Sequence, residues 1–205
     1  EAGTQALLTL VSGDGNLGGH MGVLYYRGTI DVTPPGSQGT SEAHTALLRL
    51  LPNSTTPEVV YDFGQNNPSF PASPNYMLSA GSRLFFQWGN AIWSTNGTTT
   101  EPVKTSGGAQ IYKPDNINVL NDKERYVIGS GSLFLGATRN LSVYPVILDL
   151  WAIDTNTGIA RMVHETVADG QAPELLTMLG DTLLFSSRQT LWKSDGSTAG
   201  TEQFY

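Results

Sequence analysis

A short pattern centred on a tryptophan recurs along the chain, and it limits what the chain can fold into. In three clear copies the Trp is followed, after two residues, by Asp or Asn, a small polar turn and a further short stretch. A weaker copy has Leu48 in place of the Trp. The copies are Leu47–Phe63, Ala91–Lys104, Asp149–Val163 and Thr190–Phe204. A unit that recurs at this spacing predicts a repeat architecture, in which neighbouring units bury a shared core.

Two more apolar stretches precede each copy and complete a unit of four short strands. Most of the first stretches end in Gly after a small or apolar residue, which is typical of a tight hairpin. The pairs of stretches are ALLTLVSG and GVLYYRG, NYMLSAG and RLFFQWG, RYVIGSG and SLFLGAT, and ELLTMLG and TLLFSSR. We therefore predict one all-β domain, residues 1–205, with units at about 4–64, 74–106, 118–167 and 173–205 and almost no α-helix.

Four-stranded units in tandem predict a β-propeller of four blades, each blade being four antiparallel strands. The recurring Trp would cover the area between adjacent blades. Uneven spacing of the units places extra length in the connections between their second and third strands, at residues 28–45 and 139–146. Two alternatives stay open: the four blades are part of a larger propeller, or two copies complete an eight-bladed ring.

Composition excludes several classes of function. The net charge is −7, and the 11 Lys and Arg residues are scattered without a basic cluster, so a nucleic-acid partner is not expected. No stretch of 18 apolar residues occurs, so we expect no membrane span. Cys is absent, which rules out disulfides, thiolate metal sites and a Cys nucleophile.

The last unit resembles a known repeat family. Its sequence LWKSDGSTAGT is similar to the ELWxxDGTxxGT repeat of large bacterial surface and secreted proteins, with Ser197 where Thr is usual. The third unit, LWAIDTNTG, also resembles the LWALDxxTG repeat of quinoprotein-type propellers. The resemblance covers the whole chain as architecture and only the last unit as a close motif. It implies a β-propeller and a secreted or cell-surface location, and it implies no particular chemistry.

The motif SDGSTAGT has two interpretations. Asp195 can accept backbone N–H groups two and three residues on, and Gly196 and Gly200 can adopt positive φ, so the segment can close a turn. The same residue types can bind a cation or a sugar. The turn is the favoured interpretation, because Asn or Asp recurs at this place in every unit and a catalytic residue would not need to recur.

Other candidate sites are local patterns. Asp14 and Asn16 alternate with Gly in SGDGNLGGH, which is compatible with calcium, although a Gly-rich hairpin explains the segment equally and no further carboxylate follows. No other cofactor is indicated. Asn53, Asn96 and Asn140 begin Asn-X-Ser/Thr triplets and are glycan acceptors if the protein is eukaryotic and secreted.

Aromatic residues in or near connections are the remaining candidates. Tyr26, Trp88, Tyr112 and Tyr144 are predicted to bind a ligand, by stacking on a sugar ring or anchoring a protein. The alternative is that they fill gaps beneath their loops.

We expect a non-catalytic extracellular module for binding, adhesion or assembly, with a protein or glycan partner and a homodimer or larger assembly among its forms. The competing hypothesis is a hydrolase or lyase that acts on polysaccharide through carboxylates gathered near the axis. Two or more carboxylates in one central pocket would favour that competitor.

Overall fold

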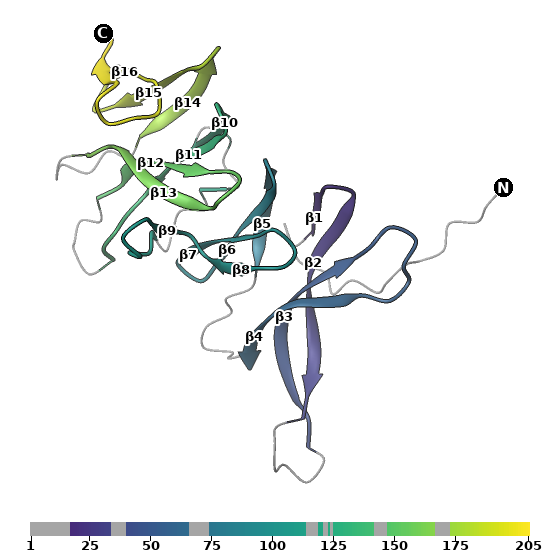
Figure 1. The fold of residues 1–205 in the computed structure, drawn as a ribbon. Helices are drawn as coiled ribbons and strands as arrows, with labels where there is room; N and C mark the ends of the chain where they lie inside the picture. The colour runs from purple at the N-terminus through teal and green to yellow at the C-terminus, as the bar shows by residue number, and fades with distance from the viewer. Residues whose placement is uncertain are drawn as a thin grey trace.

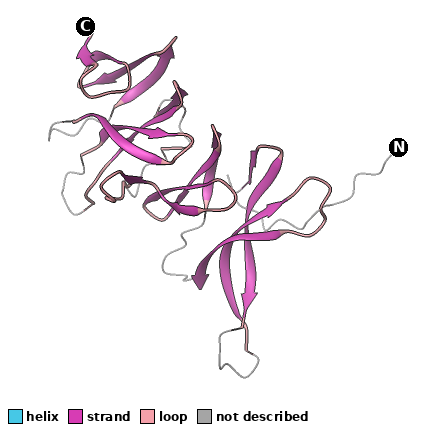
Figure 2. Cartoon of the chain, in the orientation of Figure 1, coloured by secondary structure: helices cyan, strands magenta, loops and turns pink. Residues whose placement is uncertain are grey.

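The computed structural model describes residues 17–33, 40–65, 74–113, 119–120, 123, 125–141, 147–166 and 173–205. Every regular element among these residues is a β-strand, and they contain no helix (Figure 2). The prediction of an all-β chain is therefore confirmed. Within this described part of the chain there is consequently no apolar helix of membrane-spanning length.

The strands form four sheets, each a meander of consecutive antiparallel strands. The first contains β1 (Leu17–His20), β2 (Val23–Val32), β3 (Glu42–Leu50) and β4 (Glu58–Gln65). The second contains β5 (Asn75–Ala80), β6 (Arg83–Trp88), β7 (Ala91–Thr95) and β8 (Thr100–Pro102). The third contains β10 (Tyr126–Gly129), β11 (Ser132–Ala137), β12 (Asp149–Asp154) and β13 (Ile159–His164). The fourth contains β14 (Glu174–Leu179), β15 (Thr182–Ser187), β16 (Thr190–Ser194) and β17 (Thr201–Gln203).

One strand departs from this scheme. β9 (Lys104–Thr105) follows the second sheet in the chain but pairs in parallel with β13, which makes it the fifth strand of the third sheet. The polypeptide thus links two neighbouring sheets by hydrogen bonds before it enters the third sheet.

The sheets follow one another in chain order, and the first and fourth sheets lie at opposite ends of the row (Figure 1). The first strands of neighbouring sheets lie side by side at two places, β1 against β5 and β10 against β14. This order lets each inner sheet pack one face on the sheet before it and the other on the sheet after it.

The recurring Trp defines one face of each sheet, which we call the Trp face; the opposite face is called the reverse face. Trp93 packs with residues of the first sheet, Trp151 with residues of the second and Trp192 with residues of the third. In the first sheet Leu48 lies at the corresponding place. Each Trp face of the second, third and fourth sheets is therefore directed toward the preceding sheet, where burial of a large indole stabilises the junction.

The connection expected at residues 28–45 is mostly strand. β2 continues to Val32 and β3 begins at Glu42, so the pair forms a long hairpin that extends from the rest of the first sheet (Figure 1). Thr29, Ile30 and Val32 are β-branched and pair across the hairpin, which outweighs the Gly and Pro signals around them. The prediction of a loop across the whole interval is wrong.

Candidate functional site

The Asp-Gly motif of the fourth sheet closes the turn between β16 and β17. Asp195 Oδ1 accepts a hydrogen bond from the Ser197 N–H at 2.8 Å and from its hydroxyl at 2.7 Å. These bonds from Ser197 hold the pKa of the Asp195 carboxyl below its ordinary value. The carboxylate is therefore engaged by its own turn, as the favoured interpretation of the sequence requires.

Asn96 in the second sheet and Asp154 in the third sheet likewise accept hydrogen bonds from the turns that follow them. Asn96 Oδ1 accepts from the backbone N–H groups of Thr98 and Thr99, at 3.0 and 2.8 Å. Asp154 Oδ1 accepts from the N–H groups of Asn156 and Thr157, at 2.9 and 2.7 Å. The bond from the Thr157 N–H is the main reason that the pKa of Asp154 is lowered.

Each of these turns also receives an arginine from the preceding sheet. Arg49 Nη1 donates to the Gly97 carbonyl at 2.8 Å, which joins the first sheet to the second. Arg83 Nε donates to the Asn156 carbonyl at 3.0 Å, and Arg161 Nε to the Gly196 carbonyl at 3.0 Å. All three junctions between successive sheets thus contain a guanidinium bound to a turn carbonyl.

The glycines of the motif are required for this contact. Gly97 and Gly196 have φ of +86° and +90°. A Cβ on Gly97 would lie 3.1 Å from Arg49 Nη1, and a Cβ on Gly196 would lie 3.2 Å from Arg161 Nη2. Glycine therefore permits both the left-handed backbone and the close approach of the guanidinium.

A cavity of about 130 Å³ lies where β11 ends, β12 begins and β13 ends. Its polar lining comes from Thr138, Arg139, Asn140, Asp149, Glu165 and Thr166. Arg139 and Asn140, which begin the insertion predicted at residues 139–146, line this cavity.

Two carboxylates of the cavity face one cation. Arg139 Nη2 lies 3.2 Å from Glu165 Oε1 and 3.6 Å from Asp149 Oδ2. Asp149 is 4% exposed, and its Oδ1 accepts from the Thr166 N–H at 3.0 Å. Burial raises the pKa of Asp149, against the lowering effects of the Thr166 bond and Arg139. The Thr166 hydroxyl is buried and makes no hydrogen bond.

We predict that Asp149 titrates above the ordinary range of an aspartate. Glu165→Gln should lower the pKa of Asp149 by removing a negative neighbour, and Arg139→Met should raise it by removing the cation. Because the folded-state pKa is raised, the stability this group contributes is present at low pH and is lost as pH rises through that pKa. Carboxyl ¹³C NMR titration of the three proteins measures the shifts; a wild-type pKa at or below the ordinary value would contradict the prediction.

The aromatic residues predicted to bind a ligand do not form one group in the described structure. Tyr26 is 2% exposed and packs in the apolar cluster on the Trp face of the first sheet. Trp88 packs on Phe63, with ring centroids 4.4 Å apart. The backbone of Tyr112 bridges Ala91 and Thr138. Tyr144, Asp14 and Asn16 lie outside the described residues.

The three predicted glycan acceptors are exposed. Asn53 and Asn96 lie in turns after β3 and β7, and Asn140 lies beside the cavity. Glycosylation of these residues and calcium binding by Asp14 and Asn16 stay predictions. Among the described residues, no three His, Asp or Glu side chains are placed to hold one metal ion.

Sequence reasoning did not single out Arg139, Asp149 or Glu165. Their positions in the sequence could have indicated them. Asp149 is the first residue of the strand that carries Trp151 and comes directly after an insertion, and Glu165 directly follows the neighbouring strand β13. The ends of adjacent strands at one edge of a sheet place such residues together.

Comparison with models of protein families finds no match, and neither does comparison with curated proteins.

Proposed function

We propose that the chain is a segment of β-propeller that acts as a non-catalytic binding and assembly module outside the cell or at its surface. The proposal rests on the contacts that the recurring Trp-Asp motif makes. Its Trp packs on the preceding sheet, its Asp or Asn closes the turn, and its turn carbonyl receives the Arg of that sheet. The recurring residues join neighbouring sheets, so we assign the motif a structural role and not a catalytic one.

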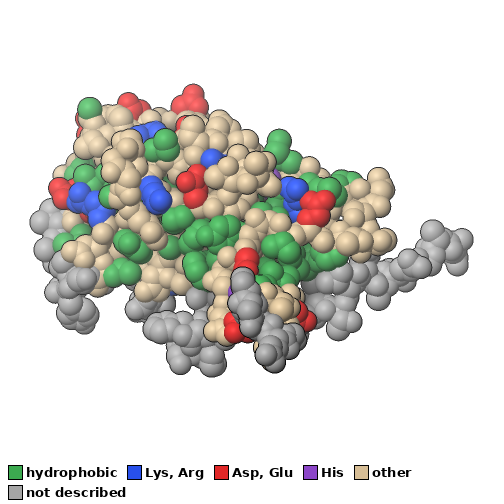
Figure 3. Space-filling view, turned by 60° about the horizontal axis from the view of Figure 1, so that its bottom comes forward, with side chains coloured by type: hydrophobic (Ala, Val, Ile, Leu, Met, Phe, Trp, Pro, Cys, Tyr) green, Lys and Arg blue, Asp and Glu red, His purple; other side chains and the backbone are tan. Residues whose placement is uncertain are grey.

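The arrangement of the sheets supports the propeller in particular. Each sheet is a four-stranded meander, and successive sheets pack Trp face on reverse face with first strands side by side at two junctions. Lys, Arg, Asp and Glu side chains are dispersed over the surface seen in Figure 3, without a basic cluster in that view. This surface suits a protein or glycan partner better than a nucleic acid. The secreted or surface location rests on the ELWxxDGTxxGT resemblance.

A second candidate is the polysaccharide hydrolase, and the cavity favours it. Asp149 and Glu165 come together in one cavity, and a raised pKa is what a general acid needs. Against this candidate, Arg139 lies within 4 Å of both carboxylates and occupies the place where a glycosidic bond would have to lie.

Both candidates are tested with immobilised and soluble polysaccharides. We expect the 205-residue chain to bind glycan without producing new reducing ends, and Glu165→Gln to leave this result unchanged. Asp149→Asn is the matched second variant. Release of reducing ends by the wild type that is lost in both variants would replace the binding module with the hydrolase.

A further inference from the structure

We propose that Glu42 and His44 on the β2–β3 hairpin bind Zn²⁺, with Asp62 orienting the imidazole, and that a second copy of the chain supplies the same two ligands. The inference rests on the proposed assembly function, because it names the partner and the ion that joins the two copies. None of the three residues takes part in the junctions between sheets described above.

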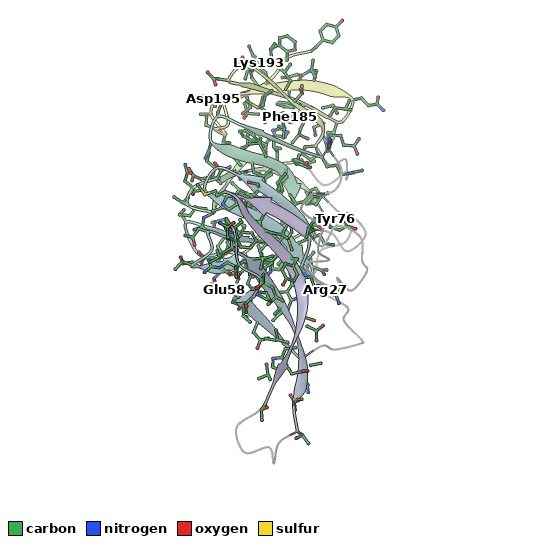
Figure 4. The ribbon with its side chains drawn as sticks, turned by 90° about the vertical axis from the view of Figure 1, so that its right-hand side faces the viewer. Arg27, Glu58, Tyr76, Phe185, Lys193 and Asp195 are labelled. Carbon is green, nitrogen blue, oxygen red and sulfur yellow. The ribbon has the colours of Figure 1, made fainter. Side chains whose placement is uncertain are left out.

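The hairpin carries these residues away from the rest of the molecule. In Figure 4 it continues beyond the labelled Arg27 and Glu58, and Figure 1 shows the same end apart from the other three sheets. Glu42 and His44 are two residues apart on β3, so their side chains project from the same face of the strand. The two side chains are 42% and 16% exposed, which leaves them open to an ion from solvent.

A β-bulge brings Asp62 to His44. Between the register pairs at His44 and Ala46, β4 contains one more residue than β3. Gly64 lies in this interval with a φ of +88°, a conformation that glycine adopts readily and that is typical of a bulge. Asp62 Oδ1 accepts from the Gly64 N–H at 2.8 Å, and Asp62 Oδ2 lies 2.8 Å from His44 Nδ1. Both oxygens of the carboxylate thus help to hold the imidazole ring in place.

The Asp62 carboxylate also fixes which nitrogen of His44 carries the proton. Burial raises the pKa of Asp62, but the hydrogen bonds from His44 and Gly64 outweigh it and hold that pKa below its ordinary value. An ionised carboxylate only accepts hydrogen bonds, so Nδ1 is the donor and the neutral ring has its lone pair on Nε2. Metal-binding histidines usually donate their other ring N–H to a carboxylate in this way, which orients the ring and raises its basicity.

The Glu42 carboxylate is the second ligand. His44 Nε2 lies 3.9 Å from Glu42 Oε2. Zinc holds such nitrogen and oxygen ligands at about 2.0–2.2 Å, and tetrahedral geometry then separates the two ligand atoms by about 3.4 Å. The partly exposed Glu42 side chain therefore has to approach by only a fraction of an ångström. A nitrogen and an oxygen together suit zinc, whereas Ca²⁺ and Mg²⁺ prefer oxygen ligands alone.

A second copy of the chain completes the coordination. Zinc in structural sites takes four protein ligands, and one hairpin supplies two. In the parts of the chain that the structure describes, no third His, Asp or Glu side chain joins them. A two-fold axis through the ion brings the same two ligands from a second hairpin, which is the self-complementary contact of a cyclic dimer.

Zinc titration of the full chain, after treatment with a chelator, tests the proposal. Isothermal titration calorimetry measures the zinc bound per chain, and light scattering measures the molar mass. His44→Gln and Glu42→Gln each remove a ligand, and Asp62→Asn keeps an oxygen for the Gly64 N–H but removes the charge that orients the ring. Glu101→Gln is the matched control, because Glu101 is exposed on β8 and the substitution removes the same charge elsewhere. Circular dichroism establishes that each variant is folded.

We expect the wild type and the control to bind one zinc ion per two chains and to change from the chain mass of 22.0 kDa to twice that mass. His44→Gln and Glu42→Gln should stay at 22.0 kDa. Asp62→Asn should need about 10–100-fold more zinc to dimerise, the usual effect of losing an orienting carboxylate, with unchanged circular dichroism. Mg²⁺ at the same concentration should leave every protein monomeric.

Three results would overturn the proposal: a wild type that stays monomeric with zinc, a wild type that binds one ion per chain, or a His44→Gln variant that dimerises as the wild type does. A chain that does not respond to zinc but still binds glycan without cleaving it would remove only this site and leave the proposed function standing.

Discussion

Trp151→Ala is expected to lower the free energy of unfolding by about 3–5 kcal/mol, the usual cost of removing a large buried aromatic side chain. Trp151 is 2% exposed and belongs to the cluster that joins the second and third sheets. Its Nε1 donates to the Ala137 carbonyl at 3.1 Å. The substitution therefore leaves a cavity at the junction and removes the indole's hydrogen bond to the Ala137 carbonyl.

Urea denaturation measures this loss of stability. Unfolding is followed by circular dichroism and not by Trp fluorescence, because the substitution itself removes a fluorescent side chain. Trp151→Phe should cost less than Trp151→Ala, since an aromatic ring still fills part of the space, although the hydrogen bond and part of the buried volume are lost. Trp192→Ala is the matched variant: Trp192 is only partly buried, and its Nε1 makes no hydrogen bond. Equal losses for Trp151→Ala and Trp192→Ala would contradict the prediction.

The strands could be predicted because their signals are local. Alternating apolar residues and Gly at hairpins mark each meander. The recurring Trp identifies the third strand in the second, third and fourth sheets, so equivalent strands of these units can be aligned. β9 could not be predicted, since two residues, Lys104 and Thr105, pair in parallel with a strand far along the chain. Nothing in a two-residue segment indicates such a partner.

The turns of the candidate site were also predictable, because an Asx side chain bonds to its own backbone. The arginines that bind them were not. Arg49, Arg83 and Arg161 come from the third, second and fourth strands of their sheets, so they share no position in the repeat. The proximity of Asp149 and Glu165 could not be predicted either, because it depends on which ends of β12 and β13 are adjacent in the sheet.

Arg83→Met is expected to lower the free energy of unfolding by about 2–4 kcal/mol, because buried hydrogen bonds from a charged donor are worth about 1.5–3 kcal/mol each. Arg83 is 7% exposed, and it donates to the Asn156 carbonyl and the Ser94 hydroxyl, both at 3.0 Å. Gly158 packs over the guanidinium, and a Cβ there would lie 3.2 Å from Arg83 Cζ. Arg83→Lys should fall between wild type and Met, since one ammonium cannot reproduce both bonds in the guanidinium geometry.

Arg161→Met is the matched control for Arg83→Met, because Arg161 makes the same bond to a turn carbonyl from an exposed position. Its loss of stability should be the smaller of the two, as solvent water can replace the bond. Since each sheet packs only on its neighbours, weakening the second junction should also broaden the urea transition as the two halves of the chain begin to unfold separately. A sharp transition with unchanged stability in Arg83→Met would show that apolar packing alone holds the sheets together, and that the arginine contacts follow from the junction without stabilising it.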